Sequence, residues 1–444
     1  MIDLIIENGT VVSHNKVSNT DIAIKNGKIF KIGNLNNERS KERFNAAGLH
    51  ILPGVFDTQV HFREPGLTHK GDIRSESKAA IAGGVTSYFE MPNTFPNTTS
   101  IEEFENKIKI ATDNSFANFS FMFGGTNDNI SEIKKINKSE VAGVKLFLGS
   151  STGKMLIDNL SAIENIFNST KLPISAHCED EQTIRDNTNH YKNIYGEDIP
   201  IELHPKIRSD KACLKSSEFA VKLANKTGAR LNVFHISTAK ELKLFDNKID
   251  IKNKKITAEV CAHHLWFTDN DYKKLGSKIK WNPAIKSQTD KDELWKALKE
   301  DKIDIIASDH APHTEEEKNN KYLNCPSGGP MVQHTILSIL QNCENYGVKI
   351  EKIVEKIAHN PAIIFQINKR GFLREGYYAD IVLIDTNTPT FVTKDSLFYK
   401  CGWSPFEGQK FDNSIYKTIL NGRVVYSDGK VKPLPIGKKL TFNR

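Results

Sequence analysis

The sequence predicts an α/β protein, a (β/α)₈ barrel of the TIM type with a small β-domain formed from both chain termini. Two observations lead to this fold class. The middle of the chain alternates short apolar runs with helical stretches, which is typical of a parallel sheet, and both ends are rich in strand and turn patterns. The length of 444 residues leaves room for both parts.

The two ends of the chain have the same texture. Asn8-Gly9 and Asn26-Gly27 are dipeptides that favour hairpins, and each is flanked by Ile and Val residues. Near the C-terminus, 379–384 and 418–426 are predicted strands, the second one turning at Asn421-Gly422. We therefore assign two ranges to one small β-domain and the rest to a barrel: 1–53 with 372–444, and 54–371.

The middle of the chain contains eight predicted strands. They share a run of apolar or β-branched residues, and they are the strand that precedes His61 and residues 85–91, 119–123, 144–148, 174–177, 231–235, 256–260 and 303–309. Helical stretches such as 101–112 and 217–227 lie between them. Alternation of this kind over roughly 300 residues fits one closed barrel.

Composition excludes several classes of protein. Apolar residues make up 38% and charged residues 26% of the chain, as in ordinary soluble proteins. No apolar run approaches the roughly 20 residues of a membrane helix, and the first residues lack the features of a signal peptide. Six scattered cysteines without a Cys-x-x-Cys pair are typical of reduced thiols, so we expect a cytoplasmic protein.

The formal net charge of +7 comes from dispersed Lys and Arg residues. Such dispersion is typical of solvated surface, although a basic balance also favours an anionic substrate. No basic stripe is interleaved with aromatic residues, so a nucleic-acid partner is not expected.

The segment from Asp57 to Gly66 is the most informative one for function. A short extended run places residues 59, 61 and 63 on one face. His61 and Arg63 then point the same way at the end of a strand, where barrel enzymes keep metals and substrates. The position that would complete a His-x-His pair holds Gln59.

Four other predicted strands carry a reactive residue at or near their ends: Lys145, His177, His235 and Asp309. A site at the C-terminal face of a barrel requires ligands scattered in this way. Imidazole and carboxylate groups suit Zn²⁺ and similar divalent ions. An Asp beside a metal-bound water can also take its proton and deliver it to a leaving nitrogen.

Taken together, the motifs resemble those of dihydroorotases, which belong to the amidohydrolase superfamily. The narrower resemblance rests on Arg63-Glu64-Pro65-Gly66 combined with Met91-Pro92-Asn93-Thr94. The other matching motifs lie between residue 54 and about residue 330, and they are 143–147, 176–179, 235–237, 257–260 with His263-His264, Asn282-Pro283 and 308–313.

The resemblance implies a role for each matching residue. His61 is similar to the second His of the His-x-His pair, and Lys145 to a bridging lysine that some members carry as a carbamate. His177 and His235 resemble the ligands of a second metal, and Asp309 resembles a residue that is both metal ligand and general acid/base. The positions that match substrate contacts are Arg63, Asn93 and His313 for a carboxylate, with Asn282 and the Ser327-Gly328 loop as further contacts.

The activity that the resemblance implies is the reversible cyclisation of N-carbamoyl-L-aspartate to L-dihydroorotate in de novo pyrimidine (UMP) biosynthesis, with one or two Zn²⁺ ions. Such families also suggest two kinds of partner: a second copy of the chain in a homodimer, and an aspartate carbamoyltransferase. The alternatives are another cyclic amidase, such as an allantoinase or hydantoinase, and a non-catalytic dihydroorotase-like subunit.

Gln59 departs from the pattern, since members of the family usually have His at this position. An amide oxygen is a harder, uncharged ligand that suits zinc less well than imidazole. Three outcomes follow for this sequence. Gln59 ligates the first metal through its oxygen, or that metal binds weakly or not at all, or the protein has lost its activity.

Overall fold

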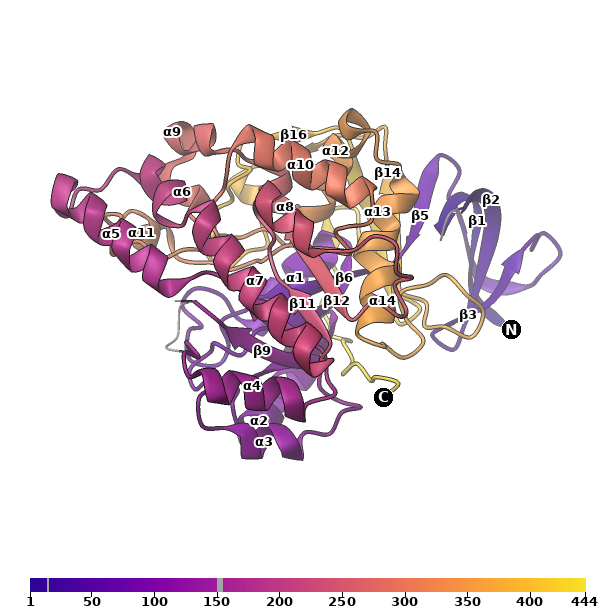
Figure 1. Ribbon diagram of the computed structural model, residues 1–444. Helices are drawn as coiled ribbons and strands as arrows, with labels where there is room; N and C mark the ends of the chain where they lie inside the picture. The colour runs from indigo at the N-terminus through magenta and orange to yellow at the C-terminus, as the bar shows by residue number, and fades with distance from the viewer. Residues whose placement is uncertain (14–15, 150–154) are drawn as a thin grey trace.

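The computed structural model describes residues 1–13, 16–149 and 155–444. In Figure 1 the N-terminal strands, in indigo, stand beside a larger body of strands and helices that the middle of the chain forms. The last part of the chain, in orange and yellow, contributes helices to the larger body and strands to the sheet of the N-terminal strands. This arrangement confirms the predicted fold class.

The larger body is built on eight parallel strands that hydrogen-bond in sequence order from β6 to β13. Their bounds are β6 Val55–Val60, β7 Val85–Glu90, β8 Asn118–Gly124, β9 Gly143–Phe147, β10 Ile174–His177, β11 Leu231–Val233, β12 Ile256–Cys261 and β13 Ile305–Ala307. Each corresponds to a strand predicted from the sequence.

The first and last of these strands meet and close the barrel. Val60 forms a parallel bridge with His310, and the backbone N–H of His61 donates to the carbonyl of His310 at 2.7 Å. Lower in the same seam, the carboxylate of Asp57 accepts from the backbone N–H of Ser308 at 3.1 Å. The segments that follow β6 and β13 therefore lie side by side.

Two strands end two residues earlier than the sequence predicts. The predicted strands reach His235 and Asp309, but β11 ends at Val233 and β13 at Ala307. The reason is the backbone, because His235 has a φ of +40° and Asp309 a φ of +47°, outside the extended region. The chain thus turns sharply where these side chains enter the site.

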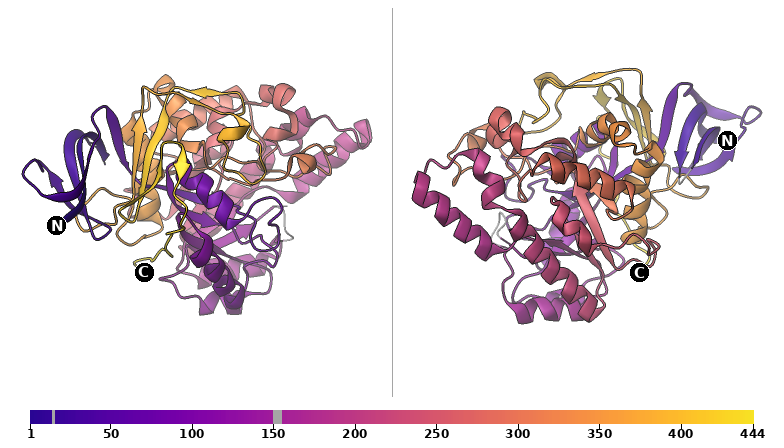
Figure 2. Two further views of the ribbon diagram at one scale, coloured as in Figure 1. Left: turned by 180° about the vertical axis from the view of Figure 1, so that it is seen from behind. Right: turned by 45° about the horizontal axis from the view of Figure 1, so that its top comes forward.

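Helices cover the outside of the barrel, as the two views of Figure 2 show. The longer ones are α1 Ile73–Ala82, α2 Ile101–Asn114, α4 Leu160–Ser169, α5 Glu181–Tyr195, α7 Asp210–Thr227, α10 Gln288–Lys299 and α12 Thr335–Cys343. Several start at a side-chain cap, for example Ser100 for α2 and Ser209 for α7. None of the helices in the described ranges is long and apolar enough to cross a bilayer.

The small domain is one sheet to which both ends of the chain contribute. Its strand order is β19-β18-β17-β14-β5-β1-β2-β3, and β4 also pairs with β1. The N-terminal strands are β1 Ile2–Ser13, β2 Lys16–Lys25, β3 Lys28–Gly33, β4 Ser40–Asn45 and β5 Leu49–Pro53, and the C-terminal ones are β14 Ile381–Asp385, β17 Ser414–Leu420, β18 Arg423–Ser427 and β19 Lys430–Val431. The exact domain boundaries at residues 53 and 372 stay a prediction.

One predicted hairpin in this sheet is wrong. Asn26-Gly27 and Asn421-Gly422 do turn between paired strands, with positive φ at both residues of each pair. Asn8-Gly9 instead lies within the single strand β1, where the pairing with β2 shifts between Ile6 and Gly9. Asn8 has a φ of +58°, and its backbone N–H donates to the carboxylate of Asp21, so the dipeptide forms a β-bulge.

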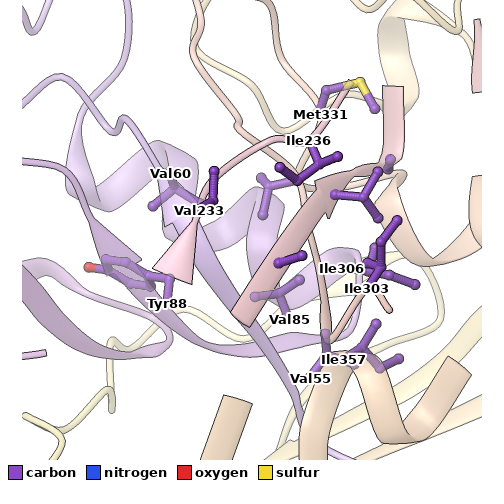
Figure 3. Packing of buried hydrophobic residues seen from close by; sticks show 14 of the residues in the cluster. Val55, Val60, Val85, Tyr88, Val233, Ile236, Ile303, Ile306, Met331 and Ile357 are labelled. Carbon is purple, nitrogen blue, oxygen red and sulfur yellow. The ribbon is translucent and has the colours of Figure 1, made fainter. Parts of the chain in front are cut away.

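Apolar side chains of the barrel strands pack against the surrounding helical segments. Figure 3 shows Val55, Val85 and Val233 from three strands with Ile306 and with Ile357 of η6 Glu355–His359 beside them. All five side chains are buried. The barrel interior below the site is partly polar, since Glu259 accepts hydrogen bonds from Thr58 and Asn232.

A buried polar cluster joins the small domain to the barrel. The carboxylate of Asp380 forms an ion pair with Arg370 and accepts from the backbone N–H of Asn421 at 2.8 Å. Its backbone carbonyl accepts from Gly54 at the start of the first barrel strand, at 2.7 Å. Because the Asp380 and Arg370 side chains are both 4% exposed, each charge depends on the other.

We therefore expect Asp380→Asn to lower the free energy of unfolding by about 3 kcal/mol, since it leaves the Arg370 cation buried without an anion. Urea denaturation followed by tryptophan fluorescence measures the change. Asp428→Asn, at an exposed turn of the same domain, is the control and should change stability by less than about 0.5 kcal/mol. Equal stability of the two variants would show that the ion pair does not join the domains.

Candidate active site

A pocket opens at the C-terminal ends of the barrel strands. All but two of the residues predicted for the site line this pocket. The lining residues among them are Gln59, His61, Arg63, Lys145, His177, His235, Asn282, Asp309, Ser327 and Gly328. They come from five strand ends and two loops that are far apart in the sequence. The structure therefore brings these predicted residues together.

The two exceptions, Asn93 and His313, lie directly behind lining residues. Asn93 Oδ1 is 2.8 Å from His61 Nδ1, so this ring nitrogen donates and the other, Nε2, keeps its lone pair. His313 Nε2 is 3.0 Å from Nη2 of Arg63 and 3.1 Å from the carbonyl of Ser327. Both residues thus orient groups that face the pocket.

The potential metal ligands form two pairs. Nε2 of His61 lies 3.3 Å from Oδ1 of Asp309, and Nδ1 of His177 lies 3.0 Å from Nε2 of His235. Bond lengths of about 2.0–2.1 Å in a tetrahedral zinc site place neighbouring ligand atoms roughly 3.3 Å apart. Both pairs therefore have close to the spacing that a shared divalent ion requires.

The imidazoles are in the form that binds metals. Burial lowers the pKa of His177, and it lowers the pKa of His61 and of His235 well below the usual value. The neighbouring cation Lys145 lowers the pKa of all three further. Neutral imidazole has a free lone pair, so no proton has to leave before an ion binds.

Lys145 lies in the same pocket with unusual surroundings. Its side chain is buried, and its Nζ has no hydrogen-bond partner among the described residues. The nearest ring, that of Phe234, has its centre 4.0 Å away. Burial lowers the pKa of Lys145 to about 7, so much of the amine is neutral near neutral pH and could react with CO₂ to give an anionic carbamate.

The chain matches known proteins over nearly its full length. The model of the amidohydrolase family matches residues 50–425. The chain belongs to the amidohydrolase family. Together with the paired imidazoles and Asp309, this membership makes it a metal-dependent cyclic amide hydrolase.

The similar proteins act on different rings, according to their names. An allantoinase from Desulfitobacterium hafniense is 32% identical, covering 99% of this chain and 98% of that protein. A dihydroorotase from Methanosarcina acetivorans is 30% identical, covering 98% and 94%. The structure of an L-hydantoinase (dihydropyrimidinase) from Arthrobacter aurescens is 26% identical with a TM-score of 0.94, covering 99% and 100%.

The sequence did not reveal the carboxylate that supports His177. Glu179 Oε2 lies 3.1 Å from Nε2 of His177, the nitrogen on the far side of the ring from His235, and it also pairs with Arg208. Burial alone would raise the pKa of Glu179, but Arg208 and His177 hold it at about 2. The available signal was its position two residues after a strand-end His, where metal-binding imidazoles often have such a partner.

Three residues of the amidohydrolase site have a left-handed backbone without being glycine. They are Arg63, with a φ of +70°, His235 and Asp309. This conformation is uncommon for residues other than glycine, more so for Arg than for Asp or His, and it persists where the surrounding structure fixes it, often at functional sites. It aims the three groups into the pocket from chain turns rather than from regular strands.

We expect Glu179→Gln to weaken metal binding by about ten- to a hundredfold, because a neutral amide supports the imidazole of His177 less well. Competition with a chromophoric chelator at fixed pH measures the affinity. The control is Asp180→Asn, a change in the neighbouring acid, whose side chain caps α5 and pairs with Lys215. An unchanged affinity in Glu179→Gln would remove Glu179 from this role.

Proposed function

We propose that this amidohydrolase is a dihydroorotase that interconverts N-carbamoyl-L-aspartate and L-dihydroorotate, with Zn²⁺ as its metal. The observation that carries the proposal is the state of Arg63. This residue supplies a buried positive charge to the pocket and has no carboxylate partner in the described part of the chain.

The contacts of Arg63 hold its guanidinium without neutralising it. Nε donates to the carbonyl of Pro312 at 2.9 Å, and Nη2 lies 3.0 Å from His313. Burial lowers the pKa of Arg63 only to about 10, so the group is charged at neutral pH. Asp309 and other nearby carboxylates attract this cation without contacting it, and a carboxylate on the substrate would add paired hydrogen bonds.

This charge discriminates among the rings that related enzymes take. Dihydroorotate has a carboxylate next to its ring, whereas allantoin and unsubstituted hydantoin have none. The relatives named allantoinase and dihydroorotase are about equally similar in sequence. The proposal of dihydroorotate over allantoin or hydantoin therefore rests on Arg63 and on the loop of Ser327 and Gly328 beside it.

The remaining groups have roles in the hydrolytic direction. A divalent ion on the His and Asp groups would supply Lewis acidity and a water with its pKa lowered to about 7. Asp309 accepts the proton of the attacking water and returns it to the departing ring nitrogen. Asn282, Ser327 and Gly328 line the space in which the ring would lie.

Arg63→Ala should raise KM for dihydroorotate by about ten- to a hundredfold with a smaller effect on kcat, since a charged hydrogen bond contributes about 1.5–3 kcal/mol. Steady-state kinetics on dihydroorotate, allantoin and hydantoin measure both the change and the preference. Arg185→Ala, on exposed α5, is the control. Preference of the wild type for a neutral ring, or no turnover of any ring, would refute the proposal.

Asp309→Ala should abolish turnover, because the proton then has no carrier between water and ring nitrogen, a loss of at least about 10²-fold. The rate is measured in both directions, with the metal content determined in the same sample. Near-normal turnover in this variant would exclude Asp309 as the acid/base.

The predicted homodimer and carbamoyltransferase association stay predictions from the sequence.

A further inference from the structure

We propose that this chain holds one divalent ion, on His177 and His235, and that Gln59 prevents a second ion from binding beside it. The inference deepens the proposed function, since it takes the same pocket as the metal centre, but it concerns the metal count rather than the substrate. Its basis is the way in which the Gln59 amide is bonded.

Both ends of the Gln59 amide have partners. The side chain is buried, its Nε2 donates to Oδ1 of Asp309 at 3.1 Å, and its Oε1 accepts from the thiol of Cys261 at 3.7 Å. The opposite orientation would set the amide oxygen 3.1 Å from an oxygen of the Asp309 carboxyl group and would lose the bond from the Cys261 thiol, because thiol sulfur is only a weak acceptor for the amide –NH₂. The neighbours thus determine which end of the amide faces Asp309.

This orientation removes ligands from the first metal position. The Asp309 oxygen that accepts from Gln59 is the same oxygen that lies 3.3 Å from His61 Nε2. An amide –NH₂ presents protons there and offers no lone pair to an ion. Reversing the amide would break the bond to Asp309 and would supply only an uncharged oxygen, a poor zinc ligand. His61 and Asp309 alone form half of a site.

The second position is better prepared. His177 Nδ1 and His235 Nε2 lie 3.0 Å apart, whereas Oδ1 of Asp309 in the first pair already accepts from Gln59. The carboxylate of Glu179 lies behind His177, and the neutral amide of Asn93 lies behind His61. A carboxylate behind the ring raises the basicity of an imidazole ligand. The ion therefore binds to His177 and His235.

In this arrangement Gln59 orients Asp309 instead of binding a metal. Its N–H fixes one oxygen of Asp309, so the carboxylate is held for proton transfer without a metal bond at that oxygen. Gln59 is thus a positioning residue that acts through Asp309.

The test is the metal content of the purified full chain, measured by mass spectrometry after saturation with ZnCl₂ and removal of unbound zinc by gel filtration. We expect one zinc per chain for the wild type and for Gln59→Ala, and two for Gln59→His, which restores an imidazole at this position. Two zinc ions or none in the wild type, or one in a folded Gln59→His, would overturn the inference.

A second pair of variants keeps the test decisive if Gln59→His does not fold. His61→Ala should retain its one zinc, and His235→Ala should lose it. Loss of zinc from His61→Ala alone would overturn the inference. Because no substrate is present in these measurements, a chain that holds one zinc but prefers a neutral ring would refute the proposed function and leave this inference intact.

Discussion

Closure of the barrel between β6 and β13 is the constraint on which the site depends. The hydrogen bond from the His61 N–H to the His310 carbonyl fixes the end of the first strand against the end of the last. This contact brings Gln59 within hydrogen-bond distance of Asp309, 250 residues away in the sequence, and brings Arg63 within reach of Pro312. Asp309, the proposed proton carrier, and Arg63, the proposed carboxylate-binding group, are therefore positioned by the same seam. Loss of the seam would separate the chemistry from the recognition of the substrate.

Burial sets the charge of the pocket before any ligand enters. It holds the imidazoles of His61, His177 and His235 neutral and lowers the pKa of Lys145 to about 7. Burial also raises the pKa of Asp309 to about 7, although Lys145 and Arg63 oppose this shift. Burial thus favours the uncharged form of each group, and the charged forms become favourable when opposite charges arrive. A divalent cation on one side and a substrate carboxylate on the other would supply them.

Much of this could be predicted from the sequence, because it depends on local pattern. The eight strands are apolar runs, and the reactive residues follow their ends at readable positions. The parts that could not be predicted depend on contacts between distant segments or on backbone conformation. Arg208, 29 residues further along the chain, pairs with the Glu179 carboxylate behind His177, and the contact of Gln59 with Cys261 joins β6 to β12. The left-handed conformations of His235 and Asp309 shorten two strands, and they were not predicted although Asp and His adopt positive φ more often than most residues. Asn8 also belongs to a residue type that favours positive φ, but it forms a bulge where a hairpin was predicted.

The proposed roles place hydrolytic chemistry and ring recognition in different parts of the site. The groups suited to a metal come from strand ends, His177 and His235 among them, and strand ends are the rigid part of a barrel. Arg63 and the Ser327-Gly328 pair lie in segments that follow the strands, where sequence and conformation can change without disturbing the core. Similar overall identity to relatives named for different rings is the expected result of this division, because most of the identity lies outside the few positions that contact the ring. The proposed substrate consequently rests on Arg63, which contacts no carboxylate in the described part of the chain, rather than on whole-chain likeness.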